Sequence, residues 1–315
     1  MGDQMRIFVA GATGVLGRTL LPMLVEAGHD VVGTTRSAAK ADSIRASGAQ
    51  PVVLDALDRD AVLEAVREAA PDVVIHQLTA IERTDFKRFD QSFAVTNQLR
   101  TRGLDHLLDA AQAAGAKRFI AQSFTGWTNK RTGGVKTEED PLDDQPARGS
   151  EKSLAAIRYL ENAVTTADSV DGLVLRYGLF YGPGTALGPG GEMLEAVRQR
   201  KLPVAGGGGG VLSFVHVADA AAATVAAVDR GRPGIYNVVD DDPAPVSVWL
   251  PYLAEAVDAG APRRVPAWLV RPMLGELGVA FMTAVRGSSN IKAKRELGWT
   301  LRYPSWRQGF RSGLG

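Results

Sequence analysis

Three glycines near the start of the chain are the residues whose spacing points most directly to chemistry. They form the pattern Gly-x-x-Gly-x-x-Gly at positions 11–17, directly after an apolar run at 5–10. In such a loop the glycines permit a tight turn, let backbone N–H groups approach a pyrophosphate and let a helix pack closely on a sheet. We therefore predict a dinucleotide-binding loop, with the helix N-terminus facing the phosphates. Its predicted contacts are Gly11, Thr13, Gly14, Val15, Leu16 and Gly17.

The end of the second predicted strand, at 30–35, bears on which dinucleotide is bound. NAD-selective sites place Asp or Glu there to bind the ribose 2′-hydroxyl, whereas this chain has Arg36 and Ser37. A guanidinium and a hydroxyl suit a 2′-phosphate, so we predict NADP(H). NAD(H) stays open, because Arg36 can also be read as a solvated loop residue. Asp55 and Ala56 are predicted to border the adenine, with a solvated Asp55 as the alternative.

Short β-branched runs alternate with longer helical patterns up to residue 181. Strands are predicted at 5–10, 30–35, 51–54, 72–76, 118–122 and 172–177, and helices at 16–27, 38–47, 58–69, 93–114 and 151–165. Strands alternating with helices form βαβ units, whose right-handed crossovers build a doubly wound parallel sheet of the α/β class. The pattern returns with a helix at 217–228 and a strand at 234–239.

The chain beyond residue 181 breaks this alternation. It is rich in Gly and Pro at 182–191 and contains five consecutive glycines at 206–210, which are either a mobile lid or a surface loop. The apolar segment at 265–285 is either core or a pocket roof. We predict a smaller, mainly helical substrate-binding lobe. The predicted division assigns 1–181 and 211–239 to the dinucleotide-binding domain, and 182–210 and 240–315 to the lobe.

Composition narrows the function classes. Lys and Arg number 36 against 35 Asp and Glu, a net charge of +1, so neither nucleic acid nor a membrane is a favoured partner. The absence of cysteine excludes disulfides, thiolate zinc sites and a cysteine nucleophile. The four histidines lack metal-site spacing, so we expect no metal. No apolar run resembles a membrane span or a signal peptide, so the expected location is the cytoplasm.

Further motifs extend along most of the chain. They are His76–Ala80, Asn97, Arg118–Ser123, Leu175–Gly184, Phe214–Asp219, Tyr236–Val238 and Lys294–Trp299. With the glycine loop they resemble the extended and atypical short-chain dehydrogenases/reductases, including the NAD-dependent epimerase/dehydratase group. The resemblance implies a Rossmann fold, a nicotinamide dinucleotide and a small-molecule substrate. It also implies cofactor contacts from Leu78, Thr79, Ala80, Asn97 and Tyr177.

The resemblance fails at the residues that do acid–base chemistry. Members of this family use a Tyr whose pKa is lowered by a Lys four residues later, with a Ser or Thr that orients the substrate oxygen. Ser123 lies where the serine is expected, but none of the six tyrosines has a Lys four residues later. Lys152 is preceded at that spacing by Arg148, which cannot shuttle a proton at neutral pH. We therefore expect a cofactor site without the usual acid–base pair.

Three functions are compatible with this combination. The first is an oxidoreductase acting on a small cyclic or aromatic carbonyl or quinone, an acceptor that stabilises its own oxyanion while the protein positions the reactants. The second is a non-catalytic NADP(H)-binding sensor or partner protein. The third is an oxidative tailoring enzyme, a monooxygenase or its component, in aromatic polyketide-type bacterial secondary metabolism, with a flavin-reductase or oxygenase partner. A homodimer is an open alternative.

Specific side chains are assigned to the first of these functions. Catalytic roles are predicted for Ser123, Lys152 and Tyr177, the last as a substitute proton donor near the nicotinamide. Substrate contacts are predicted from Ser123, Thr125, Trp127 and Arg148. Structural alternatives are a turn-forming hydroxyl for Ser123 and a buried wall residue for Trp127.

Two further groups invite a chemical role but have a simpler interpretation. His216 lies within Phe214–Asp219, which recurs as a structural element in the resembled family, so we expect a structural histidine. The adjacent carboxylates Asp240–Asp242 point in different directions along a backbone. We therefore expect a solvated turn there rather than a metal site.

Overall fold

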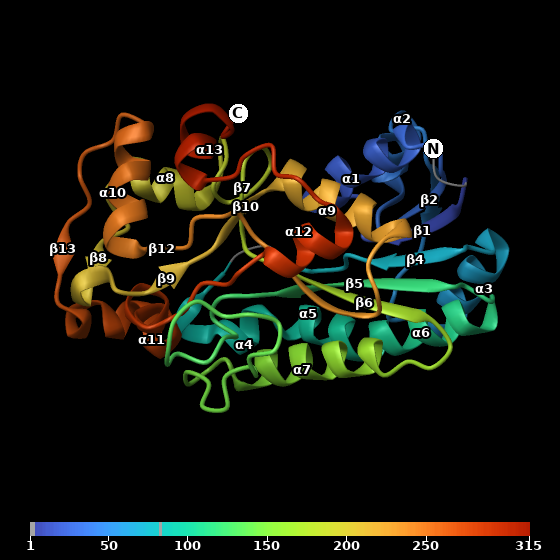
Figure 1. Cartoon of the computed structure of the whole chain (residues 1–315), viewed down its shortest axis with the longest axis horizontal. Coiled ribbons are helices and arrows are strands. Elements are labelled where there is room, and N and C mark those ends of the chain that lie inside the picture. The colour runs from blue at the N-terminus through green and yellow to red at the C-terminus, as the bar shows by residue number, and fades with distance from the viewer. Residues whose placement is uncertain (1–3, 82–83) are drawn as a thin grey trace.

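A seven-stranded parallel sheet forms the centre of the computed structural model, which describes residues 4–81 and 84–315 (Figure 1). Its strands are β1 (Arg6–Ala10), β2 (Asp30–Thr35), β3 (Gln50–Val53), β4 (Val73–His76), β5 (Arg118–Phe124), β6 (Asp171–Tyr177) and β11 (Gly234–Val238). They lie in the order β11-β6-β5-β4-β1-β2-β3, and every neighbouring pair is parallel. The predicted doubly wound α/β fold is confirmed, and the strand order reverses between β1 and β4.

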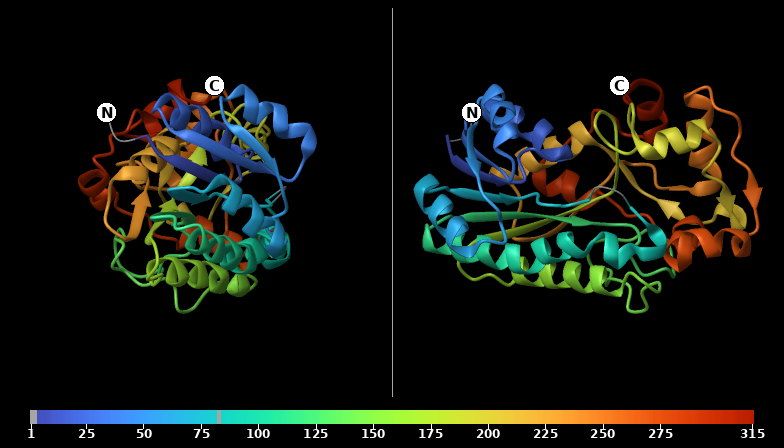
Figure 2. Two further views of the ribbon diagram at one scale, coloured as in Figure 1. Left: turned by 90° about the vertical axis from the view of Figure 1, so that its right-hand side faces the viewer. Right: turned by 180° about the vertical axis from the view of Figure 1, so that it is seen from behind.

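Helices cover both faces of the sheet (Figures 1 and 2). One face carries α1 (Val15–Glu26), α2 (Ala41–Ala46) and α9 (Val217–Asp229), and the other α3 (Arg59–Ala69), α5 (Ala94–Gln98), α6 (Leu104–Ala113) and α7 (Glu151–Thr165). Alternate residues of β1 divide between two cores, because Ile7 and Val9 pack with α1 and α9 while Phe8 and Ala10 pack with α3 and α6. This burial on both faces explains why the strands are nearly all apolar.

The rest of the chain forms a smaller, largely helical region beside the sheet (Figure 1). Its helices are α8 (Glu192–Arg198), α10 (Val246–Ala256), α11 (Ala267–Thr283), α12 (Ile291–Leu297) and α13 (Trp306–Ser312). Short strand pairs join it: β7 (Leu179–Tyr181) with β10 (Phe214–His216), β8 (Val204–Ala205) with β13 (Arg264–Val265), and β9 (Val211–Leu212) with β12 (Ala244–Pro245). Trp249, Trp306 and Phe214 lie in its core, whereas Ala293 and Leu297 of α12 pack into the core of α1 and α9.

The five-glycine run at 206–210 is held between α10 and α11. Gly210 donates its N–H to the Met282 carbonyl at 3.0 Å, and Val246 donates to the Gly210 carbonyl at 2.9 Å. Gly208 is buried at a φ of +68°, where a side chain would collide with Ser247. The run is therefore a close-packed turn, and it is neither the mobile lid nor the surface loop that the sequence suggested.

The helix predicted at 93–114 is divided into three parts. A short 3-10 turn (Phe86–Arg88) and α4 (Phe89–Ser92) lead into α5, which passes through a π-helical turn (Leu99–Gly103) into α6. A π-helical turn holds an extra residue and occurs frequently at functional sites. Here it directs the Leu99 carbonyl to His76 Nε2, at 3.2 Å, and leaves Arg100 buried.

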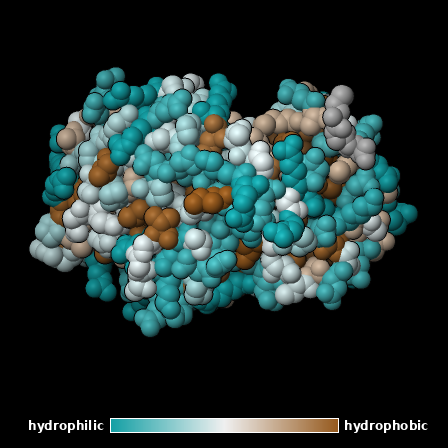
Figure 3. Space-filling model, in the orientation of Figure 1, coloured by the Kyte–Doolittle hydropathy of each residue, from teal (hydrophilic) through white to brown (hydrophobic). Residues whose placement is uncertain are grey.

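The exposed apolar side chains of the described residues form small, separate patches (Figure 3). No helix within residues 4–81 and 84–315 is long and apolar enough to cross a membrane. The face in Figure 3 is mainly hydrophilic, with separate small apolar patches. Trp268, Leu269 and Met273 are exposed together on α11, but scattered apolar side chains are usual on protein surfaces.

His76 should make stability depend on pH. Its Nδ1 accepts from the Leu78 N–H at 3.1 Å, and burial lowers its pKa to about 4. In the unfolded chain, His76 takes up a proton when the pH falls below the ordinary histidine pKa of roughly 6.5. In the folded protein, burial keeps the ring neutral at that pH. The free energy of unfolding therefore decreases as the pH falls from 6.5 toward 4, and the decrease is about 2 kcal/mol at pH 5. Urea unfolding at pH 7 and pH 5 should show a smaller loss in His76→Asn, and equal losses would contradict this origin.

Candidate active site at the carboxyl end of the sheet

The glycine loop lies where the strand order reverses, between β1 and β4. Gly11 has a φ of +98°, and a Cβ there would collide with the Gln77 carbonyl. A Cβ at Gly17 would collide with the carbonyls of Gly11 and Ala12. Gly14 precedes α1, and no side chain caps the first N–H groups of that helix. Uncapped N–H groups at the start of a helix suit a diphosphate, so the loop fits the pyrophosphate of a dinucleotide.

The ends of β2 and β3 lie beside this loop. Thr13 and Thr35 hydroxyls are 3.4 Å apart, and Ser37 donates its N–H to the Thr35 hydroxyl at 3.2 Å. Arg36 is exposed, and a carboxylate is absent from the described residues 34–40. The end of β2 therefore carries an exposed cation, and the preference for NADP(H) stays a prediction.

The predicted adenine contacts have structural roles of their own. Asp55 is exposed and accepts the Leu57 N–H at 3.0 Å in a turn. Ala56 is buried, and its carbonyl accepts from His106 Nδ1 at 3.1 Å. These contacts fix the loop after β3, and the adenine role stays a prediction.

The segment after β4 lies beside the glycine loop. Thr79 is exposed, and Ala80 donates its N–H to the Thr96 hydroxyl at 3.0 Å. Asn97 donates through Nδ2 to Ser153 at 3.1 Å, while its buried Oδ1 has no partner among the described residues. Leu78 follows Gln77, whose carbonyl faces Gly11. The structure thus brings the segments at 11–17 and 77–80 together.

Tyr177 lies beside the crevice with its hydroxyl engaged. The hydroxyl is 2.6 Å from the Thr224 hydroxyl and accepts from Gln77 Nε2 at 3.1 Å. Burial raises the pKa of Tyr177 well above its ordinary value, although these hydrogen bonds oppose the shift. A neutral, firmly held phenol suits packing near a cofactor better than proton exchange. The predicted donor role therefore gains no support from this geometry.

Ser123 points into the layer between the sheet and α7. Its hydroxyl donates to Glu161 Oε1 at 2.7 Å. Arg176 binds the same carboxylate through Nε and Nη2, at 2.7 and 2.6 Å. All three residues are buried. The hydroxyl predicted to orient the substrate is thus engaged in an ion-pair network, and its contact with substrate stays a prediction.

Thr125 and Trp127 follow β5 in two different settings. The Thr125 hydroxyl is 2.5 Å from that of Ser288 and 3.2 Å from Asn129 Oδ1. Trp127 is 8% exposed, with its ring 5.1 Å from Phe89 in an edge-on contact. Trp127 therefore lies in an aromatic wall, and its contact with substrate stays a prediction.

The start of α7 exposes both of its predicted basic site residues. Lys152 and Arg148 are both exposed, and Lys152 is held through its N–H by Asp90 at 3.0 Å. The buried position is Ser153, whose hydroxyl donates to Asp90 at 2.6 Å and accepts from Asn97. The structure thus separates Lys152 and Arg148 from the buried polar contacts.

Several functional candidates were missed in the sequence analysis. Helical periodicity places Ser153 rather than Lys152 on the buried face, a signal that was available. Glu161, Asp90 and Arg100 act through contacts between distant segments, which spacing along the chain does not show.

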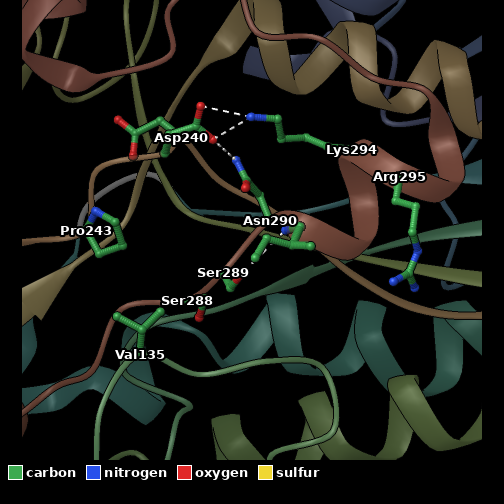
Figure 4. A pocket seen from close by; sticks show the side chains of 10 residues that line it. Val135, Asp240, Pro243, Ser288, Ser289, Asn290, Lys294 and Arg295 are labelled. Carbon is green, nitrogen blue, oxygen red and sulfur yellow. Dashed lines mark hydrogen bonds and ion pairs between the residues drawn. The ribbon is translucent and has the colours of Figure 1, made fainter.

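Asp240–Asp242 form a structural junction and not the predicted solvated turn. Burial raises the pKa of Asp240 to about 8 while it accepts the Trp306 N–H at 2.7 Å. Asp241 pairs with Lys294 at 2.9 Å. A cavity of about 580 Å³ opens beside them, lined partly by Asn290, Lys294 and Arg295 (Figure 4). Asp241 contacts Asn290 at the start of α12, and Asp240 contacts Trp306 at the start of α13. These contacts join distant segments, so a sequence pattern does not predict them.

His216 has the structural role expected of it. Its Nδ1 accepts from the Ala218 N–H at 3.1 Å and caps α9. Its Nε2 donates to the Gly313 carbonyl at 2.8 Å. Both ring nitrogens are therefore committed to neighbouring backbone.

The fold and the glycine crevice agree with known proteins. Residues 7–238 match the model of the NAD dependent epimerase/dehydratase family, and the chain belongs to that family. Its structure is similar to that of UDP-glucose 4-epimerase from Thermus thermophilus in complex with NAD, with a TM-score of 0.74, 24% identity and 98% of each chain covered.

Several relatives are named as reductases, and two of them align with most of the chain as follows. The chain is 44% identical over 308 residues to 3-diazoavenalumate denitrifying reductase from a Streptomyces species, covering 97% of this chain and 99% of that protein. It is 30% identical over 271 residues to 2-alkyl-3-oxoalkanoate reductase from Stenotrophomonas maltophilia, covering 82% and 77%. The family and these relatives identify the chain as an NAD(P)-binding oxidoreductase.

Gly17→Ala should weaken dinucleotide binding. The new Cβ collides with rigid backbone at Gly11 and Ala12, which must shift. We expect the Kd for NADPH to rise by at least about 10-fold, because displaced N–H groups lose phosphate contacts. Gly134→Ala is the matched control, since a Cβ there meets nothing within 4 Å. Fluorescence titration measures both variants, and unchanged affinity in Gly17→Ala would disprove the assigned loop.

Proposed function

We propose that this protein is an NADPH-dependent reductase that transfers hydride to an electron-poor aromatic acceptor requiring no proton from the protein, with an aryl diazo compound as the favoured acceptor. The observation that carries the proposal is a glycine loop that fits a pyrophosphate, beside an α7 start whose sequence has no Tyr–Lys pair. At the start of α7, Gly149 and Ser153 have the four-residue spacing that the Tyr and the Lys would have, and Lys152 is exposed. The Tyr177 phenol is fixed by two hydrogen bonds.

The chemistry of a diazonium acceptor balances without an acid. A bound nicotinamide supplies a hydride, which forms the new carbon–hydrogen bond. The carbon–nitrogen bond breaks and its electron pair leaves with N2, so the net products are the arene, N2 and the oxidised dinucleotide. A ketone, in contrast, gains a proton when it becomes an alcohol, and a protein acid normally supplies it. The loss of the acid is therefore costly for ketone reduction and harmless for diazo reduction.

The relative named for a 3-diazo substrate supports this acceptor, because it is 44% identical and aligned over almost all of both chains. The aromatic wall also suits a flat ring. Phe93 and Phe89 stack at 4.2 Å, and Phe89 contacts Trp127. We assign Thr125, Trp127 and the region beyond β6 to the substrate side of the site.

A carbonyl or quinone acceptor is the second candidate. The similarity to a reductase of 2-alkyl-3-oxoalkanoates favours it. In that case Ser123 or Lys152 would have to move toward the substrate, because Ser123 is bound to Glu161 and Lys152 is exposed. The present geometry therefore favours the diazo acceptor.

The proposed reaction predicts stoichiometric release of N2. With a benzenediazonium salt and NADPH deuterated at the transferred position, we expect one N2 per NADPH oxidised and deuterium in the arene. The rate should exceed both the uncatalysed reaction and that of Gly17→Ala, because hydride transfer needs a bound and oriented dinucleotide. Mass spectrometry of the gas and the arene measures both products. Oxidation of NADPH by ketones alone, without N2 from the diazonium salt, would reject the favoured acceptor.

Arg36 should determine the preference for NADPH. An exposed guanidinium beside Ser37 is suited to a charged hydrogen bond with the 2′-phosphate. Arg36→Ala should raise the KM for NADPH by about 10- to 100-fold, the range expected for a lost charged hydrogen bond. The KM for NADH is the internal control and should not change. Equal changes for the two dinucleotides would remove Arg36 from cofactor selection.

A further inference from the structure

Arg100 is a buried cation that the proposed reaction does not use. It is 5% exposed, and its Nη1 has no hydrogen-bond partner within residues 4–81 and 84–315. Burial lowers its pKa to about 10, partly opposed by Glu161, so the guanidinium stays charged at neutral pH. A buried charge without sufficient hydrogen bonds destabilises a fold strongly. Its presence therefore points to a compensating group that binds there.

The neighbouring carboxylate is already occupied. Glu161 Oε1 accepts from Ser123 and from Arg176 Nε, and Oε2 accepts from Arg176 Nη2. Two guanidinium groups and one carboxylate leave a charge of +1 in this cluster. His76 adds no charge, because burial lowers its pKa to about 4. The three buried ionised groups Arg100, Arg176 and Glu161 therefore sum to one positive charge.

Aromatic side chains lie beside Arg100. Its Cζ lies 5.9 Å from the centre of the Phe93 ring. Phe93 stacks on Phe89, and Phe89 contacts Trp127, so a continuous series of rings joins Arg100 to a predicted substrate contact. Asn97, one turn before Arg100, has a buried Oδ1 without a partner in the described structure. A cation, a free acceptor and aromatic faces therefore occur together.

We propose that Arg100 binds an anionic oxygen of the aromatic substrate, a phenolate or a carboxylate, while the ring lies along Phe93, Phe89 and Trp127. This inference rests on the proposed function for the identity of the site and deepens it by requiring negative charge on the substrate. A guanidinium repels a bare diazonium ion. An anionic oxygen on the same ring offsets that repulsion, so Arg100 selects diazo compounds that also carry an acidic group.

Binding of unreactive arenes tests this proposal without any turnover. Isothermal titration calorimetry of the NADP+-saturated protein would use three ligands: benzoate, neutral benzamide and 4-nitrophenolate. The buffer pH is kept above the pKa of 4-nitrophenol, so that this ligand is an anion. We expect Arg100→Met to weaken binding of at least one anion by about 10- to 100-fold and to leave benzamide unchanged. The anion affected identifies the carboxylate or the phenolate. Arg102→Met is the matched control, because Arg102 is exposed on the same π-helical turn.

Two calorimetric results would overturn the proposal. One is that neither anion binds the wild-type protein, and the other is that both anions bind Arg100→Met as tightly as the wild type. The N2 assay is a separate readout, so failure of the diazo reaction and failure of anion binding are distinguishable. Loss of N2 release with retained anion binding would reject the diazo acceptor alone.

Thermal unfolding of Arg100→Met distinguishes a ligand-binding cation from a structural one. Removing an unpaired buried charge should leave Tm unchanged or raise it. A fall of more than about 5 °C, or failure to fold, would make Arg100 a structural partner of Glu161 and would overturn the proposal. Arg102→Met should unfold at the wild-type temperature.

Discussion

The close approach of three backbone segments at the end of β1 is the constraint on which the rest of the site depends. Gly11, Gly17 and the Gln77 carbonyl lie so near one another that no side chain fits between them. This packing sets how α1 meets the sheet and leaves its N-terminal N–H groups uncapped. The dinucleotide crevice is therefore built from main chain, at the reversal of strand order where ligands bind in sheets of this kind.

A crevice built from backbone and a reaction centre built from side chains can change independently. The start of α7 illustrates this, because Asn97 donates to Ser153 and Ser153 donates to Asp90 on the buried side of the helix. These hydrogen bonds hold the start of α7 against α4 and α5. Hydride transfer is supplied by a dinucleotide, whereas acid–base catalysis depends on side chains, so the two can change separately in such a fold.

The sequence was most informative where short-range patterns control structure. Strand periodicity and the glycine spacing predicted the parallel sheet and the loop before α1. It was less informative where contacts join distant segments, as for Ser123 with Glu161 and Asp240 with Trp306. Spacing along the chain identifies a serine or an aspartate after a strand, but the direction of the side chain depends on which helix packs beside it.

The π-helical turn at Leu99–Gly103 has a consequence for variants that change the length of the chain. An ordinary turn would hold one residue fewer, so a single deletion there could restore a regular helix. Residues before and after the deletion would then rotate relative to one another by about 100°. Asn97 would turn away from Ser153, or Leu107 would leave the core, and the segment tolerates neither without repacking. Helix length at this point is therefore coupled to the geometry of the site.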